Sequence, residues 1–279
     1  MNNLEIENIK EDEISNNENL DEDIDVSTVK IRFFDLDMLP MSCTCVMVAS
    51  PGSGKTCLIE NIMYYKKHLY PVARIFSGTE ATNKSYSKFV PPLYISYKYD
   101  RKEEKKHIAR QQTMVQELDD KKYIGNYAIN VIDDCTDDPK IFKSPEIRAL
   151  FKLGSQHYNQ LFLLGTQYAV DLPPDIRKSI SFVFLFREPE LNERRKLYDN
   201  FGGLAGSFKN FCALMDGLTG DYRCMVINKR AQSNKLEDCI YYYKGDLLGK
   251  WQFGCKEYRD WAKQRYIPNF KPDLLGDDI

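Results

Sequence analysis

Apolar and polar positions alternate between two patterns after residue 40. Short, mostly apolar runs, typical of strands buried on both faces, are separated by segments with helical spacing. The predicted strands cover 43–48, 72–77, 93–96, 127–132, 160–166 and 181–187, with a late pair over 222–228 and 238–243. The predicted helices cover 55–67, 101–120, a segment that begins Ser144-Pro145-Glu146, 189–200, 208–214 and 251–265. This alternation predicts an α/β fold with a mostly parallel central sheet flanked by helices.

The turn between the first strand and the first helix has a composition suited to binding phosphate. It reads Ala49-Ser50-Pro51-Gly52-Ser53-Gly54-Lys55-Thr56. In a Gly-rich turn before a helix, backbone N–H groups and the helix dipole point at a bound anion. The predicted nucleotide-binding residues are Pro51, Gly52, Ser53, Gly54, Lys55, Thr56 and Cys57. Lys55 would reach the β- and γ-phosphates of ATP, and the Thr56 hydroxyl would hold Mg²⁺. The alternative is a Gly-Ser loop without a ligand.

This phosphate loop, residues 49–56, departs from the G-x-x-x-x-G-K-[ST] pattern at one position. Ala49 stands where the pattern has Gly. Alanine is acceptable there if its φ is negative and costly if its φ is positive, because of its Cβ. The structure of the loop therefore decides whether the departure matters.

Two adjacent carboxylates follow the apolar run at 127–132. We expect Asp133 to orient Mg²⁺ beside Thr56, and Asp134 to point elsewhere and polarise the attacking water. The alternative is that both carboxylates end a strand in solvent.

The wide gap between Lys55 and Asp133 admits the strand 72–77 and indicates the additional-strand division of P-loop NTPases. In that division a sensor strand lies between the two motif strands. The candidate sensor strand is 161–167, whose last residue, Gln167, would contact the γ-phosphate or the water at the carboxyl edge of the sheet. Alternatively, Gln167 is an ordinary polar residue at a strand end.

Charge is distributed unevenly along the chain. Residues 1–28 hold ten acidic residues and one basic residue, a net charge of −9, whereas residues 29–279 have a net charge of +7. We interpret residues 1–28 as an acidic disordered arm and residues 29–279 as one P-loop ATPase domain that ends in a strand pair and a helix. The arm is either a solvated tail or a mimic of nucleic acid that guards a basic channel. No run of 18 apolar residues predicts a transmembrane helix.

Several motifs together resemble one family. They are Gly52-Ser53-Gly54-Lys55-Thr56, Ile132-Asp133-Asp134, His157-Tyr158-Asn159, Leu172-Pro173-Pro174-Asp175-Ile176-Arg177 and Cys239-Ile240-Tyr241-Tyr242-Tyr243-Lys244. In order and spacing they resemble the poxvirus-type DNA-packaging ATPases of large eukaryotic DNA viruses, within the FtsK–HerA superfamily. Gln156 departs from this family, whose members often carry Arg before the matching His.

The resemblance implies a ring-shaped homo-oligomer that hydrolyses ATP with Mg²⁺ and drives double-stranded DNA into a preformed capsid. It also implies capsid or inner-membrane virion proteins as partners, and the host cytoplasm, at the viral factory, and the virion as locations. Such a motor needs a cation at the γ-phosphate, and Arg177 is the first candidate, ahead of Arg148 and Arg187. Each of these is otherwise an ordinary arginine at the surface or at a strand end.

DNA contact would be directed at the backbone and independent of sequence. The basic stretches are 84–88 and 101–110, but the second interleaves acidic residues and is favoured as a solvated helix face. A nucleotide-binding scaffold with little turnover is the alternative function. A nucleoside kinase is disfavoured because no Arg-rich lid is found.

Overall fold

The computed structural model describes residues 29–117, 124–136, 138–167 and 172–266. Its strands are β1 (Arg32–Phe33), β2 (Cys43–Val48), β3 (Val72–Ser77), β4 (Ile95–Ser96), β5 (Ala128–Asp133), β6 (Gln160–Thr166), β7 (Phe182–Leu185), β8 (Arg223–Asn228) and β9 (Ile240–Lys244). Its helices are α1 (Lys55–Lys66), α2 (Glu80–Asn83), α3 (Arg101–Glu117), α4 (Pro145–Ala149), α5 (Ser155–His157), α6 (Pro174–Arg177), α7 (Leu191–Phe201), α8 (Phe208–Leu218), α9 (Leu236–Cys239) and α10 (Lys256–Arg265). The predicted acidic arm, residues 1–28, lies outside the described residues.

The described strands form one sheet in the order β1-β9-β8-β7-β2-β6-β5-β3-β4. Strand β8 runs antiparallel to its neighbours β7 and β9, and the other described pairs are parallel. The predicted mostly parallel sheet is confirmed. Strand β6 lies between β2, which precedes the phosphate loop, and β5, which ends at the two aspartates. This is the strand order of the additional-strand division.

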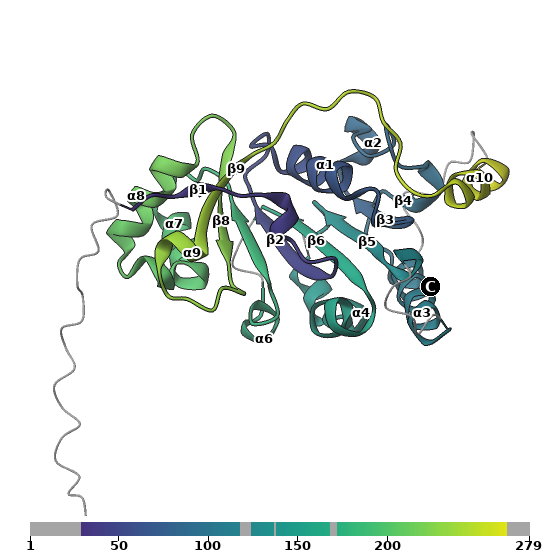
Figure 1. The fold of residues 1–279 in the computed structure, drawn as a ribbon, viewed down its shortest axis with the longest axis horizontal. Helices are drawn as coiled ribbons and strands as arrows, with labels where there is room; N and C mark the ends of the chain where they lie inside the picture. Colours follow the sequence, from purple (N-terminus) through teal and green to yellow (C-terminus); the bar gives the residue numbers. More distant parts are fainter. Residues whose placement is uncertain (1–28, 118–123, 137, 168–171, 267–279) are drawn as a thin grey trace, which may run out of the picture.

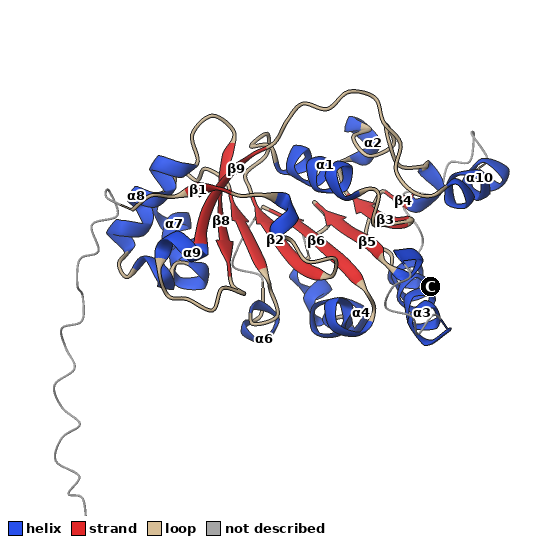
Figure 2. Cartoon of the chain, viewed as in Figure 1, coloured by secondary structure: helices blue, strands red, loops and turns tan. Residues whose placement is uncertain are grey.

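Helices cover both faces of the sheet (Figure 2). Alternate residues of β2 supply the two cores, because successive side chains of a strand point to opposite faces. Cys45 and Met47 pack in the core that includes α1, and Val46 and Val48 pack in the core that includes α4, α7 and α8. The continuous apolar runs in the sequence therefore reflect burial of the central strands on both faces.

The helix predicted over residues 251–265 begins only at Lys256. Residues 251–255 form an irregular segment in which Gly254 has φ +89°, a value that interrupts a helix. The Trp251 ring stacks on Phe89 with ring centroids 4.4 Å apart. Aromatic packing against a distant segment thus replaces the first turns of the predicted helix.

Helix α3 packs through polar residues. Glu104 and Gln111 are fully buried, and His107 is largely buried. The side-chain amide of Asn130, on β5, donates a hydrogen bond to Glu104 at 2.7 Å. Burial raises the pKa of Glu104 to about 7 and lowers that of His107 to about 3. The predicted solvated face is therefore only part of α3, and Glu104 belongs to the interior.

Candidate nucleotide-binding site

The phosphate loop connects β2 to α1 as the sequence predicts (Figure 1). Gly52 and Gly54 have φ values of +77° and +107°, which a residue with a Cβ rarely adopts. Ser53 closes the turn, because its backbone N–H and its hydroxyl both donate to the Ser50 carbonyl, at 3.2 and 2.6 Å. Lys55 is the first residue of α1, so the unsatisfied N–H groups of the helix start face the loop.

Ala49 fits this loop without strain. The described non-glycine residues with positive φ do not include Ala49. Its backbone N–H donates to the Thr166 carbonyl at 3.1 Å and extends the pairing of β2 with β6 by one residue. Glycine is therefore needed at positions 52 and 54 and not at position 49.

Both aspartates reach the Lys55 ammonium. The Lys55 Nζ lies 3.4 Å from Asp133 Oδ1 and forms an ion pair with Asp134 Oδ1. The expectation that the Asp134 side chain points elsewhere is wrong for this structure. Successive strand residues normally face opposite sides, but Asp134 has φ +50°, which turns the chain at the end of β5 and re-aims its carboxylate.

Asp133 is fully buried and is held by two hydroxyl groups. The Thr56 hydroxyl donates to Asp133 Oδ2 at 3.2 Å, and the Tyr86 hydroxyl donates to the same atom at 2.8 Å. Burial raises the pKa of the Asp133 carboxyl, the Lys55 charge opposes this rise, and Asp134 adds to it. The pairing of Thr56 with Asp133 that the sequence predicted for a metal site is present.

Tyr86 is a site residue that sequence reasoning missed. Its side chain is fully buried, and burial together with the charge of Asp133 raises the pKa of its hydroxyl, which stays a proton donor. The buried Glu80 carboxylate fixes its backbone by accepting hydrogen bonds from the N–H groups of Tyr86 and Ser87, both at 2.9 Å. Only the spacing of Glu80 and Tyr86 was visible in the sequence, and it matches no known phosphate-site pattern.

Gly165, on β6, is the second residue that was missed. A Cβ at this position would lie 2.3 Å from Asp133 Oδ1 and 3.0 Å from Lys55 Cδ. Gly78 is similarly close to the backbone, since a Cβ there would lie 2.1 Å from the Asp134 carbonyl oxygen. Both glycines allow neighbouring strands to bring Lys55 and the two aspartates together.

The remaining predicted residues lie at different distances from this cluster. Pro51 is exposed in the loop, and Cys57 is half-buried in the first turn of α1. Gln167 directly follows β6 at the carboxyl edge, next to the site. Arg177 ends α6, which directly precedes β7. It therefore lies near the amino ends of the parallel strands, whereas the phosphate loop lies at their carboxyl ends. Arg187 follows β7 at the phosphate-loop edge and is exposed, so one chain brings Arg187 and not Arg177 to this edge.

ATP and Mg²⁺ fit the residues that are present. A Cβ at Gly52 would meet no atom within 4 Å, so the loop is open on that side. Among the described residues, Asp133 Oδ1 is a buried oxygen without a hydrogen-bond partner, although it faces Lys55. Such an oxygen beside a threonine hydroxyl suits a hard cation that takes oxygen ligands. Lys55 would hold phosphates, and Thr56 and Asp133 would hold Mg²⁺.

Comparison with known families decides where the chain belongs. Residues 30–228, which include the whole cluster described above, match the family of the poxvirus A32 protein. The chain belongs to the poxvirus A32 protein family. Relatives similar to it include uncharacterized protein 088R of invertebrate iridescent virus 3, which is 35% identical over 88% of this chain and 98% of its own length. Uncharacterized protein 075L of invertebrate iridescent virus 6 is 38% identical over 79% of this chain and 85% of its own length.

Solved structures confirm the fold of this A32 family member. The genome packaging NTPase B204 from Sulfolobus turreted icosahedral virus 2, in complex with ATP-gammaS, has a TM-score of 0.52 at 18% identity, and the match covers 75% of this chain and 100% of that one. The DNA-packaging ATPase B204 from Sulfolobus turreted icosahedral virus has a TM-score of 0.53 at 17% identity, and the match covers 75% of this chain and 99% of that one. The chain therefore has the P-loop NTPase fold, and none of its described helices is long and apolar enough to cross a membrane.

Proposed function

We propose that this chain is a Mg²⁺-dependent ATPase that moves double-stranded viral DNA into a preformed capsid. The observation that carries the ATPase part is the convergence of Lys55, Thr56, Asp133 and Asp134 at the phosphate loop. The DNA-packaging part is supported by the family and by the packaging activity named for the B204 proteins. Those proteins share the fold at low identity, so the second part rests on likeness.

The chain's own residues divide the work of hydrolysis. Bound ATP supplies the phosphoanhydride bond, and bound Mg²⁺ supplies charge that offsets the developing negative charge. Lys55 exchanges its ion pair with Asp134 for a phosphate contact, which frees the Asp134 carboxylate to orient and polarise water. Asp133 and Thr56 hold the metal, and Tyr86 keeps Asp133 in place. Gln167 contacts the γ-phosphate or the water from the end of β6.

A cation from a neighbouring subunit completes this site. Arg177 is our first candidate, because a residue at the amino ends of the strands, away from the phosphate loop, can act only on the site of another copy. Arg187 is the alternative, since it is exposed at the phosphate-loop edge. The variant Arg177→Ala should bind ATP but lose hydrolysis stimulated by DNA. Normal turnover in Arg177→Ala together with loss in Arg187→Ala would transfer the role to Arg187.

The proposed partners follow from the work of packaging. The chain acts as a ring-shaped homo-oligomer, contacts the DNA backbone independently of sequence, and docks on capsid or inner-membrane virion proteins. It acts in the host cytoplasm, at the viral factory, and in the virion. Native mass measurement with a non-hydrolysable ATP analogue and duplex DNA tests the assembly, and a strict monomer under all conditions would contradict it.

One experiment separates the motor from a nucleotide-binding scaffold. ATP hydrolysis is measured with Mg²⁺ or with a chelator, and with or without long duplex DNA. We expect Mg²⁺-dependent turnover that DNA stimulates and that falls about 100-fold or more in Asp134→Asn. The control Asp199→Asn changes an exposed carboxylate on α7 and should turn over normally. A low rate that neither DNA nor Asp134→Asn alters would favour the scaffold.

A further inference from the structure

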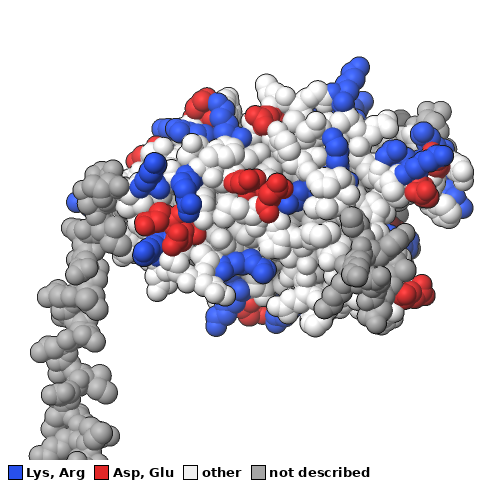
Figure 3. All heavy atoms as spheres, in the orientation of Figure 1, with Lys and Arg blue, Asp and Glu red and all other residues white. Residues whose placement is uncertain are grey.

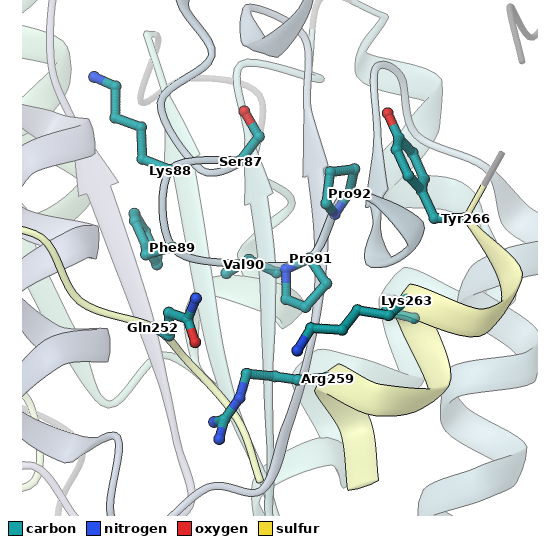
Figure 4. A pocket seen from close by; sticks show the side chains of 11 residues that line it. Ser87, Lys88, Phe89, Val90, Pro91, Pro92, Gln252, Arg259, Lys263 and Tyr266 are labelled. Atoms are coloured by element: carbon teal, nitrogen blue, oxygen red, sulfur yellow. The ribbon is translucent and has the colours of Figure 1, made fainter. Parts of the chain in front are cut away.

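A second pocket lies outside the nucleotide site, between the segment 87–92 and α10 (Figure 4). It encloses about 240 Å³, a volume that suits a few side chains rather than a cofactor. Val90, Pro91, Pro92 and Ala262 supply apolar surface. Figure 4 shows the Arg259 and Lys263 side chains, both from α10, extending beside Pro91.

The charge of this pocket has one sign. Among the described residues that line it, every charged side chain is a cation: Lys88, Arg259 and Lys263. The Arg259 guanidinium also donates to the Gly254 carbonyl, and Lys263 lies 3.8 Å from Asp260 on the exposed side of α10. In Figure 3, Lys and Arg side chains gather at the right end of the molecule, where α10 lies, with acidic side chains among them. An apolar floor with a cationic rim is complementary to a peptide that mixes acidic and aliphatic residues.

One segment of this chain has that composition. Residues 1–28 carry a net charge of −9, and their aliphatic residues lie among the acids: Leu4, Ile6, Ile9, Ile14, Leu20, Ile24 and Val26. The stretch 20–25, for example, reads Leu-Asp-Glu-Asp-Ile-Asp. We propose that the pocket between residues 87–92 and α10 binds the acidic segment 1–28 of a second copy of this chain.

The strand order favours a second copy over the same chain. Residue 29 leads into β1, and the pocket lies next to β4, at the opposite edge of the sheet. Eight strand spacings of about 4.8 Å separate these edges by about 38 Å. Twenty-eight extended residues span about 90 Å, so path rather than reach favours the neighbour. In a ring that places the β1 edge of one copy beside the β4 edge of the next, the segment enters its neighbour's pocket without crossing its own sheet. The inference therefore rests on the oligomer in the proposed function, but not on ATP hydrolysis.

The pocket wall is continuous with the support of the nucleotide site. Ser87, Lys88 and Phe89 line the pocket, and the preceding residue, Tyr86, donates its hydroxyl hydrogen bond to Asp133. Glu80 binds the backbone N–H groups of both Tyr86 and Ser87. An acidic segment seated in the pocket thus contacts the same short segment that holds the metal-binding carboxylate of its neighbour.

Photo-crosslinking in the full chain tests the proposal. The substitution Tyr266→p-benzoylphenylalanine places a reactive group at the pocket, where Tyr266 is 44% exposed. The matched control, Trp261→p-benzoylphenylalanine, lies on α10 outside the pocket lining and is 51% exposed. Light and ¹⁵N-labelled chains are mixed, irradiated and analysed by mass spectrometry, so that crosslinks between copies are distinguished from crosslinks within one chain.

We expect crosslinks from position 266 to residues 1–28 of another copy, and few from position 261. Adding Lys88→Glu and Lys263→Glu to the Tyr266→p-benzoylphenylalanine chain should lower the crosslink yield about tenfold, because the pocket loses its cations. The yield of the Tyr266→p-benzoylphenylalanine chain without these changes should also fall at 1 M salt, because exposed charge pairs are screened. Crosslinks to residues 1–28 within one chain, to residues 267–279, or to no part of residues 1–28 would overturn the assignment. Nucleotide binding, measured on the same samples, reports separately on the ATP site.

Discussion

Gly165 provides the sharpest test of the site, because a single methyl group there meets the Asp133 carboxylate. In Gly165→Ala the new Cβ would lie 2.3 Å from Asp133 Oδ1 and 3.0 Å from Lys55 Cδ. Ordinary contacts at a Cβ are 3.4–4 Å, so the Asp133 carboxylate must move by about 1 Å. It has little room to do so, because Tyr86 and Thr56 hold its other oxygen.

The expected cost has two parts. Overpacking a tight interior typically costs about 1–3 kcal/mol of folding free energy. For a chain of this size, that corresponds to a fall in Tm of several degrees. Displacement of a positioning group by about 1 Å can cost about 100-fold in rate. We therefore expect Gly165→Ala to fold, to melt a few degrees lower, and to hydrolyse ATP about 100-fold more slowly than the parent.

Steady-state ATP hydrolysis over a Mg²⁺ titration and thermal unfolding measure these two effects. The matched control is Gly217→Ala, because a Cβ at Gly217, on α8, would meet no atom within 4 Å. This control should keep the parental rate and melt at or slightly above the parental Tm, because alanine favours a helix over glycine. Parental turnover by Gly165→Ala, at the parental Mg²⁺ requirement, would refute the packing of Asp133 against β6.

Two further predictions concern buried polar groups. Tyr86→Phe removes a hydrogen bond to Asp133, so we expect about tenfold slower ATP hydrolysis and a higher Mg²⁺ requirement. The control Tyr258→Phe loses a buried hydrogen bond to the Ala73 carbonyl and should lower only the Tm. The pKa of Glu104 is about 7 in the folded chain, above its usual value, so its contribution to stability is lost as the pH rises from about 4.5 to about 7. The free energy of unfolding, measured with urea, should therefore rise in Glu104→Gln relative to the parent by about 1.4 kcal/mol for each pH unit in that window. A difference that does not change with pH would contradict the burial of Glu104 as a protonated acid.

Local sequence patterns were sufficient for the elements that form the site. The strands predicted at 43–48, 72–77 and 160–166 have the same bounds in the structure, because each is a short, mostly apolar run next to polar or glycine residues. The glycines at positions 52 and 54 adopt the positive φ values that only glycine readily takes. The pairing of Thr56 with Asp133 was predicted because the carboxyl ends of parallel strands meet at one edge.

Patterns failed where a distant segment competes with local propensity. Residues 251–255 have the spacing of a helix but form an irregular segment, in which Trp251 stacks on Phe89. Glu104 was read as solvated from its charged neighbours in sequence, yet it faces Asn130 in the interior. In both cases the deciding contact joins segments that are far apart along the chain.

The class of fold, the phosphate loop and the two carboxylates at the end of β5 could all be predicted from the order of the residues. The three-dimensional arrangement was needed to show that both aspartates reach Lys55 and that Tyr86 and Gly165 set the position of Asp133. It also revealed the cationic pocket beside α10. The physical reason is that a turn or a strand follows from neighbouring residues, whereas steric fit and ion pairing between strands depend on how the whole sheet assembles.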